Sequence, residues 1–366
     1  MSESQPILSK VRQHLRALSG YVPIEPPEVL AERLGIAAEE IVKLDGNENP
    51  YGPSPRALKA LADCRTYHIY PDPEQRRLRQ ALSRYLDMPA ESIIAGAGSD
   101  ELIDLAVRLF VPPGGGVLNF PPTFGMYAFS TEIADGRILN VERRADFSLD
   151  LDTIRKAAPD ANLIFVASPN NPTGNSLGRD EIDVLLGTGL PVVIDEAYAE
   201  FAGQSCIGLI REHPNLIVLR TLSKWGGIAG LRVGYMVASR ELIDVAMKIK
   251  QPYSISVAAD VAAVASLEDA DNLRHNLKTI IKERERLAGL LSGIDYLDVL
   301  PSEANFLLCR VQGKEARAIR DRLAKQGIMI RYFDTPILQN YIRITVGRPD
   351  QTDKVIAALQ DIARVG

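Results

Sequence analysis

Three short apolar runs in the middle of the chain each lead into polar residues that could do chemistry. The run NLIFVAS is followed by Asn171 in PNNPTG, and PVVID ends at Asp195. Tyr198 lies three residues further on, and NLIVLRT leads to Lys224. The carboxyl ends of parallel strands meet at one edge of a sheet, where ligands bind. We therefore expect these four side chains to lie in one site.

The residue types indicate an amine nucleophile beside a buried acid. Lys224 lies among small residues and glycines, which can desolvate its amine, favour the neutral form and permit Schiff-base chemistry. A carboxylate at the end of an apolar strand is costly to bury alone, so Asp195 requires a partner such as a protonated pyridine nitrogen. Tyr198 and Asn171 could then hydrogen-bond a phenolate oxygen on the same ring. Taken singly, each residue also has an ordinary structural explanation, whereas their shared position at strand ends favours a site.

A strand, a glycine-rich turn and a helix start are predicted over residues 92–110, SIIAGAGSDELIDLAVRLF. Ser99 and Asp100 begin the helix, where free backbone N–H groups and the helix dipole attract an anion. Glu101 stands where a dinucleotide fingerprint needs a small residue, so a single phosphate is the expected guest. Ser223 and Arg232 could complete the phosphate site. The alternative is an ordinary strand-to-helix turn with a capping side chain.

The elements that must position these residues fall into two groups. Between residues 91 and 240, apolar runs of four to eight residues alternate with helical patterns, which is typical of a mostly parallel α/β sheet covered on both faces. A long helix is predicted from Asp271 to about residue 291. Beyond it, strand-like segments with one helix between them indicate a smaller α+β domain. We predict an N-terminal arm with part of the small domain over 1–50, a large domain over 51–265 and a small domain over 266–366.

Composition excludes several other classes. The 366 residues carry a formal net charge of −5 and no long basic block, which argues against nucleic acid as a partner. No stretch has the roughly 18 uncharged apolar residues of a membrane span. The four histidines are widely separated, so no metal site is expected, and the three cysteines form no C-x-x-C pair. These features favour a cytoplasmic protein.

The motifs together resemble the fold-type I pyridoxal-phosphate aminotransferases, and within that family the enzymes that act on histidinol phosphate. The resemblance covers nearly the whole chain. It runs through LDGNENPYGPSP, YPDP, GAGSDELIDL, PPTFGMY, SPNNPTG, VVIDEAYAEF, RTLSKWGGIAGLRVGY, PSEANFLL and YIRITVG. The chain departs from the family pattern directly after Lys224, where Trp225 and Gly226 replace a small residue and an aromatic one.

The resemblance implies roles for particular residues. Lys224 would form the covalent bond to pyridoxal 5'-phosphate, Asp195 would contact the pyridine nitrogen, and Tyr198 and Asn171 the ring oxygen. Phe124 would stack on the ring. The cofactor phosphate would be bound by Ser99, Asp100, Ser223, Arg232 and, from the partner subunit of a homodimer, Tyr70. Substrate would be bound by Tyr21, Asn47, Arg331 and Arg343.

The same resemblance implies an amino-group exchange between histidinol phosphate and 2-oxoglutarate, which gives imidazole acetol phosphate and glutamate in histidine biosynthesis. Two enzymes of the same fold stay open as alternatives: an aromatic amino-acid aminotransferase and a pyridoxal-phosphate-dependent decarboxylase of a phosphorylated amino acid. A non-catalytic binding module with this fold is the more remote alternative, because Lys224, Asp195 and Arg232 are all present.

Overall fold

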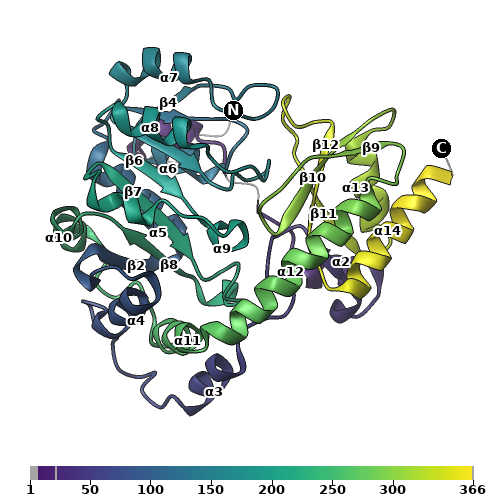
Figure 1. Cartoon of the computed structure of the whole chain (residues 1–366), viewed down its shortest axis with the longest axis horizontal. Helices are drawn as coiled ribbons and strands as arrows, with labels where there is room; N and C mark the ends of the chain where they lie inside the picture. The colour runs from purple at the N-terminus through teal and green to yellow at the C-terminus, as the bar shows by residue number, and fades with distance from the viewer. Residues whose placement is uncertain (1–6, 21–22, 365–366) are drawn as a thin grey trace.

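The apolar runs between residues 93 and 237 form one seven-stranded sheet, in the computed structural model that describes residues 7–20 and 23–364 (Figure 1). Its strand order is β2-β8-β7-β6-β5-β3-β4. Strands β3 to β7 run parallel, whereas β8 is antiparallel to both β7 and β2. The strands are β2 (Ile93–Ala97), β3 (Gly116–Asn119), β4 (Arg137–Asn140), β5 (Leu163–Ala167), β6 (Val192–Asp195), β7 (Leu216–Thr221) and β8 (Val233–Val237). The predicted mostly parallel α/β sheet is therefore confirmed.

Helices cover both faces of this sheet, which is why its strands are apolar on both sides. Successive residues of β6 point to opposite faces: Val193 packs in the cluster formed with α5, α6 and α10, and Ile194 in the cluster formed with α4, α7 and α8. These helices are α4 (Arg76–Leu86), α5 (Gly98–Phe110), α6 (Met126–Ile133), α7 (Leu151–Ala157), α8 (Arg179–Gly187) and α10 (Arg240–Ile249).

A second sheet of five strands lies in the smaller lobe, in the order β1-β11-β12-β10-β9 (Figure 1). Its edge strand β1 comes from the N-terminal region and pairs in parallel with β11. The strands are β1 (Val42–Leu44), β9 (Leu297–Val299), β10 (Phe306–Val311), β11 (Ile328–Tyr332) and β12 (Tyr341–Thr345). Helices α2 (Pro27–Leu34), α13 (Ala316–Ala324) and α14 (Pro349–Arg364) lie with it. Further helices are α1 (Gln13–Ala17), α3 (Pro55–Asp63), α9 (Ala199–Ala202) and α11 (Val257–Glu268).

The helix predicted from Asp271 is α12 (Ala270–Leu291), whose 22 residues run from the large lobe to the small one (Figure 1). Leu273, Ile280 and Leu287 form its buried stripe. At 1.5 Å per residue the helix is about 33 Å long, so it spans the width of a small domain. In the described part of the chain, no helix is long and apolar enough to cross a membrane.

Candidate active site

The carboxyl-end edge of the large sheet opens into a cavity of about 450 Å³ that residues of both sheets line. Most of the residues singled out from the sequence lie on its wall: Asn47, Ser99, Asp100, Phe124, Asn171, Asp195, Tyr198, Ser223, Lys224, Arg232, Arg331 and Arg343. Tyr21 lies outside the described residues. Tyr70 is 79% exposed, stacks on Tyr253 and does not line this cavity.

Asp195 is buried at the end of β6 and accepts two hydrogen bonds. Tyr127 Oη donates to Oδ2 over 2.8 Å, and the Ala197 backbone N–H donates to Oδ1 over 3.0 Å. Burial raises the pKa of Asp195 to about 6, although these two hydrogen bonds act in the opposite direction. Because no cation of the described chain is bonded to it, the carboxylate is suited to a cationic group that enters the cavity.

Lys224 is the third residue after β7, and its side chain lines the cavity. Its Nζ donates to the Gly46 carbonyl over 2.9 Å. Burial lowers the pKa of Lys224 to about 8; the charge of Glu48 raises it, and Arg343 lowers it further. A substantial fraction of the amine is therefore neutral near physiological pH, as a nucleophile or general base requires.

Hydrogen bonds orient the side chains of Tyr198 and Asn171 in the cavity. Asn47 Nδ2 donates to Tyr198 Oη over 2.9 Å, so the phenol hydrogen is available to a ligand oxygen. Burial raises the pKa of Tyr198 to about 12, which keeps it a donor. Arg343 Nη1 donates to Asn171 Oδ1 over 2.5 Å, which leaves Asn171 Nδ2 as a second donor. Two N–H or O–H groups can thus converge on one oxygen.

The start of α5 forms the phosphate end of the cavity. Gly98 has a φ of +80°, and a Cβ there would lie 2.5 Å from Arg232 Nη2. A Cβ on Gly234 would lie 2.4 Å from the Ser99 backbone nitrogen. Because these two residues are glycines, the first turn of α5, which contains Ser99, can lie close to strand β8 and to Arg232. Arg232 also pairs with Asp100 over 2.8 Å.

This donor set fits a phosphorylated pyridine ring. One end offers free helix N–H groups, Ser223 and a guanidinium, and the other offers the buried carboxylate of Asp195. Phe124 lines the wall between the two ends and packs edge-on against Tyr127, with ring centroids 5.7 Å apart. The anionic and cationic parts of such a ligand would therefore each meet the opposite charge.

Arg331 and Arg343 belong to the small sheet and face the same cavity. They are direct partners across β11 and β12, so their side chains project from the same face. Like charges directly opposite each other in a sheet are destabilising unless an anion lies between them. Arg343 is 4% exposed and also donates to the Asp45 carbonyl over 2.5 Å. The pair is suited to a doubly charged anion such as a phosphate.

The two unusual residues after Lys224 are well packed. Trp225 is 1% exposed, its indole stacks on Tyr85 with centroids 5.1 Å apart, and its carbonyl accepts from Asn49 Nδ2. A Cβ on Gly226 would lie 2.7 Å from the Leu222 carbonyl oxygen, so only glycine fits there. The large indole thus fills the space behind the lysine from the side of α4.

Sequence reasoning missed Tyr127, Thr221 and the apolar segment with Phe333 and Leu338, which also line the cavity. Tyr127 lies three residues after Phe124, so the spacing of a helical turn could have indicated that both side chains face the cavity. Thr221, three residues before Lys224, donates to Ser223 Oγ over 2.9 Å. No sequence signal marks the segment from Phe333, because it reaches the cavity only through the small sheet.

Comparison with known proteins agrees with this geometry. The family model for aminotransferase class I and II matches residues 39–359, and the chain belongs to that family. It is 51% identical to the histidinol-phosphate aminotransferase of Roseiflexus castenholzii, over 98% of this chain and 99% of that protein. It is 43% identical to the chloroplastic histidinol-phosphate aminotransferase 1 of Arabidopsis thaliana, over 96% and 85%.

A solved structure is also similar along its full length. Histidinol-phosphate aminotransferase from Sinorhizobium meliloti, in complex with pyridoxal-5'-phosphate, superimposes with a TM-score of 0.88 at 30% identity. The match covers 98% of each chain. The fold predicted from the sequence, that of fold-type I pyridoxal-phosphate-dependent transferases, is therefore confirmed.

Proposed function

We propose that the chain is a pyridoxal-phosphate-dependent histidinol-phosphate aminotransferase that uses 2-oxoglutarate as amino-group acceptor. The main observation in favour of this substrate is that Arg331 and Arg343 lie opposite each other in the same cavity as Lys224. Histidinol phosphate carries a phosphate and no carboxylate, and 2-oxoglutarate carries two carboxylates, so both present anions to this pair. The relatives named above support the same substrate.

The fit of the cavity supports a residue for each part of the cofactor. Asp195 would hold the pyridine nitrogen, Tyr198 and Asn171 the ring oxygen, and Phe124 the ring face. Ser99, Asp100, Ser223 and Arg232 would hold the phosphate. When bound, pyridoxal phosphate supplies the electron sink and carries the amino group between the two substrates.

The chain's own residues supply binding and proton transfer. Lys224 Nζ, made partly neutral by burial, takes the proton from the substrate carbon that bears the amino group. Ionised Asp195 keeps the opposite end of the cavity negative. Arg331 and Arg343 fix the substrate anion, and Asn47 holds Tyr198 in its donor orientation. Tyr21 is proposed to cover the substrate as well.

We propose that a homodimer completes the site and that the domain boundaries follow 1–50, 51–265 and 266–366. Tyr70 lies on the surface with other exposed apolar side chains, Leu58, Tyr67 and Ile69. A second copy packed on this surface would cover them and bring Tyr70 to the partner's phosphate site. The unpaired Cys64, Cys206 and Cys309 fit the reducing environment of the cytoplasm, where we place the enzyme.

The test is an amino-group transfer assay on the full-length protein loaded with pyridoxal phosphate. Glutamate formed from 2-oxoglutarate is measured with histidinol phosphate, histidinol or phenylalanine as donor. We expect histidinol phosphate to exceed the other two at least about a hundredfold in kcat/KM, because they leave the two arginines without the phosphate. A preference for phenylalanine would point to the aromatic aminotransferase instead. Release of carbon dioxide from a phosphorylated amino acid would point to the decarboxylase.

A further inference from the structure

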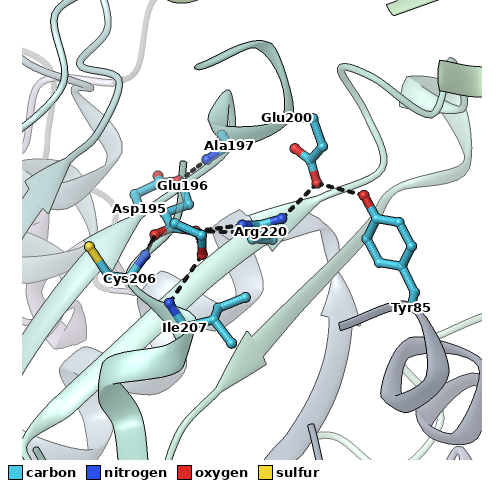
Figure 2. Close-up of polar contacts among 9 residues, drawn as sticks. Tyr85, Asp195, Glu196, Ala197, Glu200, Cys206, Ile207 and Arg220 are labelled. Carbon is cyan, nitrogen blue, oxygen red and sulfur yellow. Dashed lines mark hydrogen bonds and ion pairs between the residues drawn. The ribbon is translucent and has the colours of Figure 1, made fainter. Parts of the chain in front are cut away.

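Glu196, Arg220 and Glu200 form a buried ion cluster (Figure 2). Arg220 donates from Nε and Nη2 to Glu196 Oε2, over 3.0 and 2.8 Å, and from Nη1 to Glu200 Oε1 over 3.0 Å. The three side chains are at most 8% exposed. None of them lines the cavity, so any effect on the reaction must pass through other residues.

One end of the cluster is attached to Asp195. Glu196 is the next residue in the chain, and its backbone N–H donates to the Leu219 carbonyl on β7, directly before Arg220. Its carboxylate also accepts from Ser205 Oγ and from the Cys206 backbone, over 2.7 and 2.5 Å. Figure 2 shows this end of the cluster, where Glu196 contacts the Arg220 guanidinium and Asp195 accepts from the Ala197 backbone N–H. The end of strand β6 is thereby fixed to its neighbour.

The other end of the cluster leads to Lys224. Glu200 Oε1 accepts from Tyr85 Oη over 3.5 Å, at the far side of the guanidinium in Figure 2. The ring of Tyr85 stacks on Trp225 at an interplanar angle of 11°. Trp225 follows Lys224 directly, and Arg220 lies four residues before Lys224. The cluster is therefore linked to Asp195 through Glu196, and to Lys224 through Tyr85 and Trp225.

The charges of the cluster bear on Asp195. Two buried carboxylates share one guanidinium, and an uncompensated negative charge nearby disfavours the ionised form of a carboxyl group. The titratable groups that face Asp195 are Tyr127 from α6, Asp100 from α5, and Glu196 and Tyr198 from its own connection. Burial is the main cause that raises the pKa of Asp195, and the charges of Asp100 and Glu196 add to it. Arg220 compensates Glu196 through two hydrogen bonds.

We propose that Arg220 is a positioning residue for amino-group transfer: by compensating Glu196 and Glu200 it keeps Asp195 ionised and fixes the backbone that carries Lys224. This inference rests on the proposed function and deepens it, because an ionised Asp195 matters only if a protonated pyridine ring binds in the cavity. It assigns a task to residues that touch neither cofactor nor substrate.

The experiment measures the affinity of the full-length protein for pyridoxal phosphate between pH 5 and 9 by equilibrium dialysis. In the wild type, affinity falls on the acid side as Asp195 takes up a proton. In Arg220→Met the midpoint of this fall should move upward by on the order of one pH unit. Adding Glu196→Gln and Glu200→Gln to that variant removes every charge of the cluster, and the midpoint should return to the wild-type value or below.

A purely structural role of Arg220 predicts the opposite order, because the triple variant loses more hydrogen bonds than the single one. An unmoved midpoint in Arg220→Met, or no return in the triple variant, would overturn the proposal. Arg220→Lys is the matched control, since it keeps the charge and should keep the wild-type midpoint.

If Arg220→Met does not fold, Glu196→Gln alone decides the question. It removes one negative neighbour of Asp195 and should lower the midpoint, and an unchanged midpoint would overturn the proposal. A wild-type protein that binds no pyridoxal phosphate would instead refute the proposed function, and this inference with it. Binding by the wild type with unmoved midpoints in the variants would refute the inference alone.

Discussion

Replacing Asp195 with asparagine should stabilise the cofactor-free protein while removing its activity. Burial raises the pKa of this carboxyl from 3.8 to about 6 in the folded chain. A difference of about two pH units corresponds to roughly 3 kcal/mol, by which the ionised carboxylate lowers the free energy of unfolding at pH 8. Asparagine avoids this cost because it is neutral and of nearly the same size.

The replacement also removes one hydrogen bond, the one that Tyr127 donates to Asp195. The asparagine oxygen can accept from the Ala197 N–H, and its Nδ2 can donate to Tyr127 Oη. The phenol hydrogen of Tyr127, which now donates to Asp195 over 2.8 Å, then has no acceptor. A lost hydrogen bond of this kind costs about 1 kcal/mol. We expect a net gain of about 2 kcal/mol, or about 3 °C in Tm for a chain of this length.

The gain should depend on pH in a defined direction. Because the pKa of Asp195 is higher in the folded than in the unfolded chain, the wild type loses stability as the pH rises from 3.8 to about 6. Above that window the loss is complete, and below it the carboxyl is protonated in both states. The advantage of Asp195→Asn should therefore be full at pH 8 and absent near pH 4.

Thermal unfolding of the cofactor-free protein at several pH values measures this directly. Asp183→Asn is the matched control, because its carboxylate forms an exposed pair with Arg179 and should change Tm little. A variant Asp195→Asn that is less stable than the wild type at pH 8 would refute the reasoning, as would a gain that persists at pH 4. Added pyridoxal phosphate should raise the Tm of the wild type more than that of Asp195→Asn.

Four further substitutions and one control test other parts of the site. Lys224→Ala should abolish glutamate formation while circular dichroism shows a folded protein, and full activity would remove the lysine from the reaction. Arg343→Ala and Arg331→Ala should each weaken the binding of phosphorylated substrate by about 2–5 kcal/mol, measured from KM and from inhibition by phosphate. Unchanged kinetics in both variants would exclude these arginines from the substrate site. Gly98→Ala should reduce cofactor affinity about tenfold in equilibrium dialysis, because its φ is +80° and the new Cβ meets Arg232. Gly114→Ala carries similar backbone strain in open space and should lower stability without changing that affinity.

The large sheet could be predicted because most of its strands are short, continuous apolar runs in the sequence. Buried strands such as β5, LIFVA, are apolar at every position, and the polar residues that follow them stand out against that background. This is why Asn171, Asp195 and Lys224 could be assigned to one edge. Strand β4 was not predicted, since it is a partly exposed edge strand whose sequence RILN gives no such contrast.

Other parts of the site depend on pairings that a sequence does not display. Arg331 and Arg343 are opposite each other only because β11 and β12 pair in one register, and their roles came from a family resemblance. The Tyr127 hydrogen bond to Asp195 joins residues 68 positions apart. The ion pair of Arg220 with Glu196 lies on the far side of β7 from the cavity, where nothing in the motif draws attention to it.

Three consecutive residues, 45–47, contact Arg343, Lys224 and Tyr198, which are proposed to bind substrate, transfer the proton and bind the cofactor. The Asp45 carbonyl accepts from Arg343, the Gly46 carbonyl accepts from Lys224, and the Asn47 N–H donates to Thr345 while its side chain donates to Tyr198. One inserted or deleted residue here would misplace all of these contacts together. Anyone redesigning this enzyme for a new amine should therefore leave that segment at its present length and vary the apolar wall around Phe333 and Leu338 instead.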